Sequence, residues 1–584
     1  MSRAAPIDSG STPVAGAPPE ARPNAAAKVE SNAGRPAGEV GVDPAAVDRS
    51  APPVSKGTHA TAAPAAVLET PRLSRVSGPD YRFAARFDPR AIVQDPAVAA
   101  EFWNQYLKYE GRFLHEAIND RTGLPFDGLD IDPATGAVKS VRDWSAPSKI
   151  SLSLGLAGLA LSGKTSSAAV LGSGDVAKGR VNALAMLEKS ITTLEHWQAQ
   201  HPESGGYLPW YGTQPNGDLR ILPDWQVEGG YQLPVVDNGE FAWSMLITEQ
   251  ILEDQGYHDL ARRYHAYNQR LIDHAATIFF DHEVQKVRGD ALVKKGADGQ
   301  FHYETDWDHT QVDENSKYRV SVMTGNTEQE SLMLLLFVTT FGKNLTPQEI
   351  ASTYQDTKFR LKDTEDGTTL MGPHGSSHEL WARLFLPFEQ AEPGFADLFR
   401  AHEQVRARYF ADKGTPGFAT AAGVPRGYPN PVDGTYAGEQ GLPPLAYEPV
   451  KYDDMFAVYG VFPLLLEYAG QTKQNPGLAW LHSSLVPAMQ TPYGAREAGT
   501  NDGKHVTDCK TIDGTVPLPM AFDGGVAPFA ERMMEQRLGG DGRPAWESYR
   551  ERLQALYKDA FGDAKLIPPG PEVLLPGGAT VPAR

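Results

Sequence analysis

The chain has little of what several classes of protein depend on. Cys509 is the single cysteine among 584 residues, which excludes an intramolecular disulfide and a metal site built from several cysteines. No stretch approaches the roughly 18–20 apolar residues that a membrane span requires, so we expect no transmembrane segment. Lysine and arginine number 54 against 73 aspartates and glutamates, and they are not clustered. Because nucleic-acid binding relies on basic groups that neutralise phosphates, nucleic acid is not an expected partner.

The N-terminal region lacks large apolar side chains. From Met1 to about Ser77 it consists mainly of Ala, Pro, Ser, Gly and Val. Such a segment cannot bury enough apolar surface to offset its ordering entropy, so residues 1–77 are predicted to be disordered. Arg3 is not followed by the apolar run of a Sec-type signal peptide. The composition resembles leaders of bacterial type III secretion, although an ordinary linker looks similar. We therefore expect a secreted protein, translocated into host cells, with a periplasmic or cytoplasmic location as the alternative.

The remainder of the chain predicts one large domain. No second linker of comparable length interrupts residues 78–565, and barrels routinely exceed the usual domain size. Residues 566–584 are rich in Pro and Gly and are predicted to form a C-terminal tail. The sequence carries no signal for the oligomeric state.

The apolar spacing in this domain is helical. Apolar residues recur at steps of three and four over 181–194 and 260–278, which predicts amphipathic helices with one buried stripe. Over 241–252 and 332–341 they occupy nearly the whole circumference, which predicts helices buried on most sides. Further helices are expected over 377–388, 394–410, 453–468, 476–488, 525–537 and 544–559. The two kinds of helix, joined by long loops, predict an all-α fold, an (α/α) toroid; the absence of a 30–45-residue repeat disfavours an open solenoid.

Three acidic residues lie at expected helix starts. Asp237 precedes the helix over 241–252, Glu330 precedes the helix over 332–341, and Glu379 begins the helix over 377–388. Each also fits a capping box, a purely structural explanation that stays open. In a toroid the N-termini of the inner helices gather at one end, so the carboxylates are expected to converge there. Cleavage of an acetal needs one protonated carboxyl and a second carboxylate, so this pattern indicates a glycoside hydrolase.

Seven short motifs follow one another in the order of a known family. They are 120–125 (DRTGLP), 149–155 (KISLSLG), 206–211 (GYLPWY), 236–239 (VDNG), Glu330 twelve residues before Gly342, 375–379 (GSSHE), and 506–508 (VTD) with 512–514 (IDG). With them, residues 102–553 resemble the glucoamylase-like (α/α)6 proteins. That group includes the β-1,2-glucanases of glycoside hydrolase families 144 and 162 and the related transglycosylase domain of family 189.

The resemblance implies an (α/α)6 toroid with long functional loops that acts on a β-glucan, most simply as an endo-β-1,2-glucanase. It makes Glu330 the general acid and Asp513 the first choice for the general base, with Asp508 second. In this group the acid can act through a substrate hydroxyl and the base through a chain of waters. The residues expected to bind sugar are Asp237, Glu379, His378, Trp210, Tyr211, Tyr428, Tyr447 and Glu448.

The sequence departs from the family pattern beside the proposed chemistry. Leu332 stands where the family has arginine, Thr515 replaces a glycine, and His378 replaces an aromatic residue. Two other functions therefore stay open, a retaining β-1,2-glucan transglycosylase and a non-catalytic carbohydrate-binding protein that interacts with a host. His374 and His378 have a spacing that suits a metal, but no third histidine or HExxH motif accompanies them, so neither a metal nor another cofactor is expected.

Overall fold

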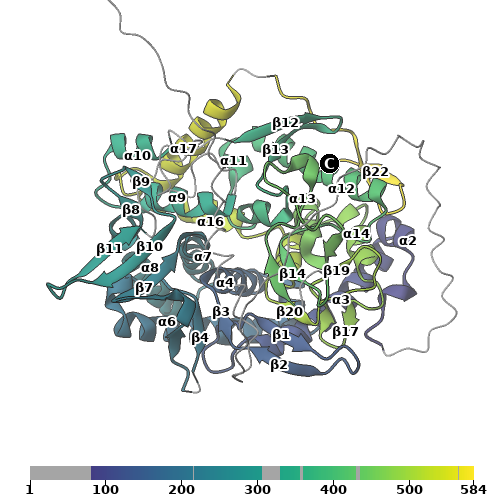
Figure 1. Ribbon diagram of the computed structural model, residues 1–584, viewed down its shortest axis with the longest axis horizontal. Helices are drawn as coiled ribbons and strands as arrows, with labels where there is room; N and C mark the ends of the chain where they lie inside the picture. The colour runs from purple at the N-terminus through teal and green to yellow at the C-terminus, as the bar shows by residue number, and fades with distance from the viewer. Residues whose placement is uncertain (1–79, 215, 306–328, 355–358, 429–433, 563–564) are drawn as a thin grey trace, which may run out of the picture.

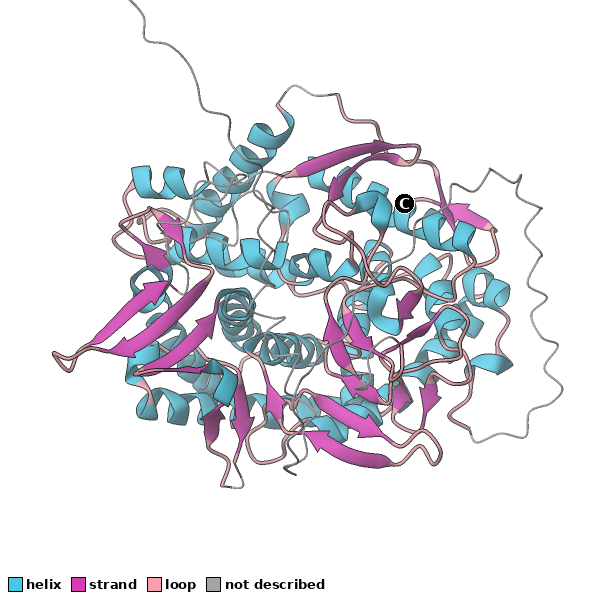
Figure 2. Cartoon of the chain, viewed as in Figure 1, coloured by secondary structure: helices cyan, strands magenta, loops and turns pink. Residues whose placement is uncertain are grey.

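The computed structural model describes residues 80–214, 216–305, 329–354, 359–428, 434–562 and 565–584. The predicted disordered region, residues 1–77, lies outside them. Helices occupy the middle of the molecule, and short strands lie mainly toward its periphery (Figures 1 and 2).

Six helical segments pack side by side in chain order. They are α4 (Pro147–Leu161), α7 (Val235–Asp254), α9 (Gln329–Phe341), the 3-10 helix η5 (Ser377–Leu384), α13 (Phe462–Glu467) and α15 (Pro517–Phe522). Each contacts the next, and α15 contacts α4, so the contacts form a closed ring. In Figure 1, these two ring members α4 and α7 lie near the middle of the molecule, with α9 beside α7.

The inner helices are buried because they are apolar on nearly all sides. In α7 every residue from Asn238 to Leu252 is buried, and in α9 so is every residue from Leu332 to Phe341. The prediction of buried helices over 241–252 and 332–341 is therefore confirmed. Close approach also requires a glycine, since a Cβ on Gly239 of α7 would lie 2.5 Å from the backbone nitrogen of Leu334 in α9.

Longer helices pack on the outside of this ring. They include α6 (Val176–Gln200), α8 (His258–Phe279), α12 (Gly394–Lys413) and α17 (Ala545–Phe561). The helix α6 contacts α4, and α8 contacts both α7 and α9. The helix α12 contacts α13, and α17 contacts α9. The buried stripe of α6 contains Leu187, Ile191 and Leu194, as predicted. Val181, predicted to begin that stripe, is instead 69% exposed. The helices thus form two layers.

Antiparallel strands, which the helical spacing did not predict, build the connections. A four-stranded sheet has the order β11-β10-β7-β6; its strands are β6 (Gln226–Val227), β7 (Gly230–Pro234), β10 (Asp290–Lys295) and β11 (Phe301–Thr305). A three-stranded sheet has the order β2-β1-β20, with β2 at Val138–Arg142. The strand β1 (Gly128–Ile131) pairs with β20 (Cys509–Thr511), so segments nearly 400 positions apart in the sequence lie side by side. The helix expected over 453–468 begins instead as the strand β16 (Met455–Ala457), followed by η7 (Val458–Val461) and α13. The helical core is as predicted, and the strands modify its loops.

The C-terminal segment packs on the helical body. Its hairpin of β21 (Glu572–Leu574) and β22 (Thr580–Pro582) contacts α12. Val573 is 1% exposed, and the side-chain amide of Gln404 donates to the Gly570 carbonyl at 2.7 Å. Residues predicted to be a tail therefore contribute to the core.

In the described parts of the chain, no single helix is long and apolar enough to cross a membrane. The pair of α4 and α5 (Thr165–Leu171) meets the length and composition criteria only jointly, across a bend of 115°.

Candidate active site

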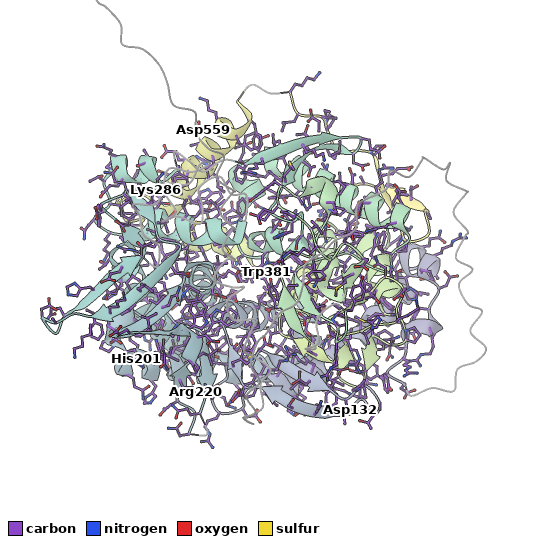
Figure 3. All side chains as sticks on the ribbon, in the orientation of Figure 1. Asp132, His201, Arg220, Lys286, Trp381 and Asp559 are labelled. Carbon is purple, nitrogen blue, oxygen red and sulfur yellow. The ribbon has the colours of Figure 1, made fainter. Side chains whose placement is uncertain are left out.

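The N-terminal ends of the inner helices carry polar groups. Lys149 lies in the first turn of α4, Asp237 in the first turn of α7, and His378 in the first turn of η5. The predicted acid Glu330 is the second residue of α9, but its side chain lies outside what the structure describes. Figure 3 shows Trp381 of η5 near the middle of the molecule, whereas Asp132 and Arg220 lie at its edge.

Lys149 links two aspartates from different parts of the chain. Its Nζ lies 2.5 Å from Oδ2 of Asp513 and 3.3 Å from Oδ1 of Asp127. Asp127 is 3% exposed, whereas the Asp513 side chain keeps 21% of its surface exposed. Burial alone would lower the pKa of Lys149, but Asp513 and Asp127 outweigh that effect and raise it. The lysine therefore stays charged, and Asp513 is the member of this group that a ligand can reach.

A second cation stabilises Asp127 from the other side. Arg142 places Nη1 3.5 Å from Oδ2 of Asp127 and donates from Nε to Oδ1 of Asp130 at 2.9 Å. Burial raises the pKa of Asp127, and the charges of Lys149 and Arg142 partly offset that rise. Opposite charges thus alternate from Arg142 through Asp127 and Lys149 to Asp513.

Asp237 is held by two donors that aim its carboxylate. The Ser148 hydroxyl donates to Oδ1, and the Trp210 indole Nε1 donates to Oδ2 at 2.9 Å. Burial raises the pKa of Asp237, while these two bonds and Lys149 oppose the rise. The capping-box prediction for Asp237 is wrong, because the helix begins earlier, with Pro234 as its N-cap. Asp237 is thus a partly exposed carboxylate of the first turn, free of a capping role.

Glu240 lies one turn further along α7 and is 1% exposed. Ser151 donates a hydrogen bond to its Oε2 at 3.1 Å. Burial raises its pKa well above the ordinary value, and the charge of Asp237 adds to that effect. Lys149, Asp127, Asp513, Asp237 and Glu240 are called the Lys149 cluster below.

Three tryptophans stack beside this cluster. The Trp210 ring lies between Trp144, at 5.3 Å and 9°, and Trp225, at 5.4 Å and 17°. Trp210 and Trp144 are partly exposed, whereas Trp225 is buried. The Trp210 loop is fixed to α7 because Asn238 exchanges two hydrogen bonds with the backbone of Leu208. Both faces of Trp210 are covered by its two neighbours, so Trp144, the partly exposed outer ring of the stack, provides the apolar surface on which a sugar ring can stack.

Tyr211, also predicted to contact sugar, belongs to the core. It is 1% exposed, and its hydroxyl lies 3.4 Å from the Pro125 carbonyl. The neighbouring Trp210 is presented to the cluster because alternate residues of an extended segment face opposite ways.

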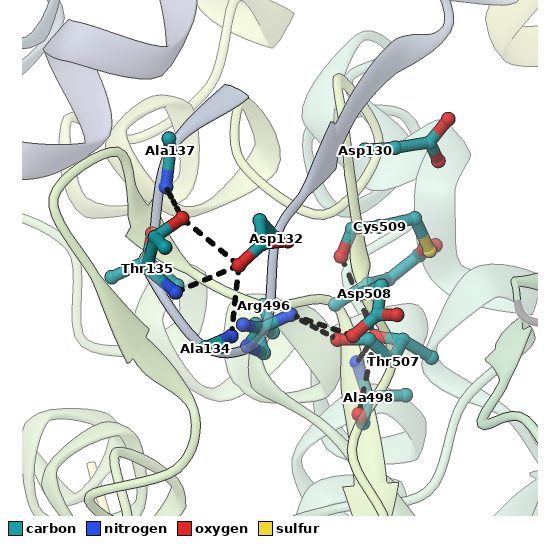
Figure 4. Close-up of polar contacts among 12 residues, drawn as sticks. Asp130, Asp132, Ala134, Thr135, Ala137, Arg496, Ala498, Thr507, Asp508 and Cys509 are labelled. Atoms are coloured by element: carbon teal, nitrogen blue, oxygen red, sulfur yellow. Dashed lines mark hydrogen bonds and ion pairs between the residues drawn. The ribbon is translucent and has the colours of Figure 1, made fainter. Parts of the chain in front are cut away.

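The second candidate base, Asp508, has a different partner from Asp513. Figure 4 shows it beside Arg496, whose Nη1 lies 3.3 Å from its Oδ1, next to Cys509 on β20. The Asp508 side chain is 24% exposed. The loop before β2 is a separate feature, in which Asp132 accepts from Ala134 and Thr135.

The two predicted residues of η5 have different environments. Glu379 is 6% exposed, and its Oε1 accepts from the His374 backbone N–H at 2.7 Å. Its carboxylate packs so closely on Gly372 that a Cβ there would overlap it, so Glu379 helps to fix the 372–374 loop. His378 is partly exposed with its ring 5.1 Å from Trp381; burial, with a smaller effect from Lys149, lowers its pKa to about 4. The capping box expected at Glu379 is formed only in part: the Ser376 hydroxyl caps the helix by accepting from the His378 N–H at 3.2 Å, whereas the Glu379 N–H donates to the Ser376 carbonyl at 3.3 Å.

The remaining predicted sugar contacts lie on other loops. Tyr428 stacks on His505 at 5.6 Å. The Arg360 guanidinium lies 3.9 Å from the centre of the Tyr447 ring, and Glu448 is exposed with Oε2 3.7 Å from His374. Tyr428, Tyr447 and Glu448 therefore contact these neighbouring side chains. The predicted site residues that lie at or beside the Lys149 cluster are Asp513, Asp237, Trp210 and His378.

Sequence reasoning missed several residues of the cluster. Lys149 is the one charged residue in the otherwise apolar or small run of 147–161, and a buried lysine requires a carboxylate partner. Asp127, Trp144 and Ser148 carried no such signal, because their roles depend on contacts between distant segments. Among the described residues, no group of three or more His, Cys, Asp or Glu side chains is arranged to hold a metal ion.

A cavity of about 420 Å³ lies away from the cluster. Its lining includes Arg383, Glu389, Arg400, Glu467 and Arg584. Arg383 and Glu467 belong to the C-terminal ends of η5 and α13, whereas the cluster lies at helix N-termini.

Comparisons with known proteins bear on the family and the fold. The family model described as endo-β-1,2-glucanase SGL matches residues 124–582. The solved endo-β-1,2-glucanase of Talaromyces funiculosus in complex with sophorose is 24% identical, with a TM-score of 0.71, and covers 83% of this chain and 94% of its own. A glutamate-to-glutamine mutant of it, in complex with β-1,2-glucan, has 23% identity, a TM-score of 0.71 and the same coverage, 83% and 94%. A putative glucoamylase of Bacteroides uniformis has 11% identity and a TM-score of 0.50 over 78% of this chain and 97% of its own. These structures share the fold, and no curated protein sequence matches significantly.

Proposed function

The chain belongs to the endo-β-1,2-glucanase SGL family, glycoside hydrolase family 162, and we propose that it cleaves β-1,2-glucan internally at the Lys149 cluster. The closed ring of contacts among the inner helices supports an (α/α)6 toroid whose helix N-termini face the substrate. The observation that carries the proposal is the partly exposed Asp513 carboxylate, fixed at 2.5 Å by a buried ammonium group.

In the proposed reaction Asp513 is the general base. Lys149 occupies Oδ2, which leaves Oδ1 to accept a proton from the attacking water, directly or along a chain of waters. The water oxygen bonds to the anomeric carbon as the glycosidic C–O bond breaks. Glu330, at the start of α9, supplies the proton that the leaving oxygen takes up, directly or through a substrate hydroxyl.

Two neighbouring groups are assigned to the sugar. Asp237 accepts hydroxyl hydrogens, because its carboxylate is partly exposed and already oriented by Ser148 and Trp210. The exposed indole of Trp144 provides a stacking surface next to Lys149, whose Nζ lies 5.7 Å from the ring centre. Together these contacts fix one glucosyl unit against the base.

The test uses linear β-1,2-glucan and counts new reducing ends. Wild type should release them, and Asp513→Asn and Glu330→Gln should each lower kcat/KM by about 10²–10⁴-fold, the usual contribution of a general acid or base. Asp412→Asn, an exposed change on α12, is the matched control and should keep wild-type activity.

Three results would contradict the proposal in different ways. Glucans redistributed in size with no new reducing ends would indicate the transglycosylase. Sugar binding without turnover would indicate the non-catalytic protein. Wild-type turnover by Asp513→Asn would remove Asp513 as the base, and Asp508→Asn would then be the next variant to measure.

We also propose that residues 1–77 direct export by a type III route, so that the enzyme acts on glucan outside the cell that makes it. The support is compositional, since the segment is rich in Ala, Pro and Ser and lacks large apolar residues. A translocation reporter fused to residues 1–77 should reach the host cell in a strain with the secretion system, and retention in the bacterium would refute the proposal.

A further inference from the structure

We propose that Lys149 is a positioning residue, fixed by Asp127, that aims the Asp513 carboxylate and whose charge sets the acid limb of the pH dependence of catalysis. This inference rests on the proposed function, because it assigns the base to Asp513. It concerns a residue that does not itself exchange a proton with the substrate.

The contact between Lys149 and Asp513 is rigid at its lysine end. Lys149 extends from the first turn of α4, a helix in which nearly every residue is buried, and its side chain is 8% exposed. Trp144 lies on one side, with its ring centre 5.7 Å from Nζ. The ammonium group therefore cannot move into solvent without losing its contacts with both Asp513 and Asp127.

This contact is also fixed at its carboxylate end. The Ile512 N–H donates to the Asp127 carbonyl at 3.0 Å, so the residue before Asp513 is tied directly to the backbone of Asp127. The Asp127 side chain in turn contacts Lys149 and Arg142. Both the main chain and the side chain of Asp127 thus locate Asp513 relative to the lysine.

Charge explains why a cation is needed at this position. Asp513 faces carboxyl groups from several elements: Asp127 before β1, Glu240 of α7 and Glu497 before β19 (Ala498–Thr500), together with the Tyr459 hydroxyl of η7. Lys149 faces Asp127, Asp513 and Asp237, and its charge also reaches His378. Lys149 is the cation that contacts the Asp513 carboxylate directly among these acidic groups, at 2.5 Å.

The readout is the pH dependence of kcat/KM, whose acid limb reports the base of the free enzyme. Lys149→Met keeps the length of the side chain and removes its charge. We expect the acid limb to move up by about one pH unit or more, and kcat at the optimum to fall at least about tenfold while KM changes little. Lys149→Arg keeps the charge and should return the acid limb most of the way to its wild-type position.

A second variant separates this role from stability. Lys149→Met leaves Asp127 buried with a single cation, which is destabilising in itself. Lys149→Met/Asp127→Asn removes both charges and should recover much of the melting temperature, yet the acid limb should stay displaced, because the cation that contacts Asp513 at 2.5 Å is still missing.

The outcomes decide the matter. If folded Lys149→Met keeps the acid limb of the wild type, Lys149 is structural and the inference is overturned. The same follows if Lys149→Met/Asp127→Asn, which restores the melting temperature without the lysine charge, has the acid limb of the wild type. If Asp513→Asn is fully active, the proposed base is wrong whatever Lys149 does. If Asp513→Asn is inactive and Lys149→Met has an unshifted acid limb, the inference about Lys149 is wrong, but the proposed function stands.

Discussion

Two buried lysine–carboxylate pairs lie on neighbouring segments of the described chain, and they differ in what surrounds them. Lys510 of β20 pairs with Glu110 of α3 (Pro96–Ala117), and both side chains are at most 1% exposed. Lys149 pairs with Asp513, whose side chain keeps 21% of its surface. The first pair is closed on all sides, and the second opens at its carboxylate.

The closed pair is satisfied by the protein alone. Ala495 donates from its N–H to Glu110 Oε1 at 2.7 Å and accepts from Lys510 Nζ at 2.8 Å. Burial raises the pKa of Glu110 and lowers that of Lys510, so desolvation works against both charges. In contrast, the pKa of Lys149 is raised, because the negative charges of Asp513 and Asp127 both stabilise its ammonium group. The same chemical pair thus holds segments together in one place and leaves a carboxylate available for chemistry in the other.

The largest expected effect comes from breaking each pair at its carboxylate. Asp513→Asn should cost about 10²–10⁴-fold in kcat/KM with little change in melting temperature. Glu110→Gln should leave kcat per folded molecule near wild type but destabilise the fold by about 3–5 kcal/mol, because it leaves a buried ammonium unpaired. Steady-state kinetics and urea unfolding of both variants measure these two effects. Equal losses of activity in Asp513→Asn and Glu110→Gln would contradict the difference between a catalytic and a structural pair.

The second prediction removes the closed pair altogether. Glu110→Leu/Lys510→Met replaces both charges with apolar groups of similar size and should recover most of the stability lost in Glu110→Gln. Chemical denaturation measures this difference. A double variant as unstable as the single one would show that hydrogen bonds to Ala495, rather than the unpaired charge, dominate.

The third prediction concerns the donor that orients Asp237. Trp210→Phe keeps an aromatic ring in the stack and removes the bond to Oδ2, so kcat/KM should fall by about tenfold, the value of one hydrogen bond to a charged group. Trp225→Phe is the matched control, because the Trp225 Nε1 is buried with no partner within the described residues. Equal losses in the two variants would assign the effect to ring size.

The smallest expected effect is the pH dependence contributed by His378. Its pKa is about 4 in the fold and near 6.5 when unfolded, so the unfolded chain binds a proton that the folded chain refuses in this window. Stability from a neutral His378 is therefore lost as the pH falls from about 6.5 toward 4. His378→Gln lacks this loss, and its melting temperature relative to wild type should rise between pH 7.5 and pH 5. A constant difference would contradict the assignment; the effect is small because His378 is partly exposed.

The sequence was sufficient for the features that depend on local periodicity. The buried helices α7 and α9 and the amphipathic α6 and α8 follow from the spacing of apolar residues. The strands were not predicted because they are short and pair across long separations, as β1 does with β20.

The candidate site was predictable only in part, for the same reason. Asp237 and Asp513 were found from motifs, but their partners Lys149, Ser148 and Asp127 come from other segments. Tyr211 shows the opposite error, since an aromatic residue in a conspicuous loop turned out to pack in the core.

The most direct measurement is the release of reducing ends from linear β-1,2-glucan by wild type and Asp513→Asn at equal folded concentration. We expect steady release by wild type, a shift toward short β-1,2-linked oligosaccharides, and a loss of at least about 10²-fold in the variant. No release by the wild type, or undiminished release by Asp513→Asn, would contradict it.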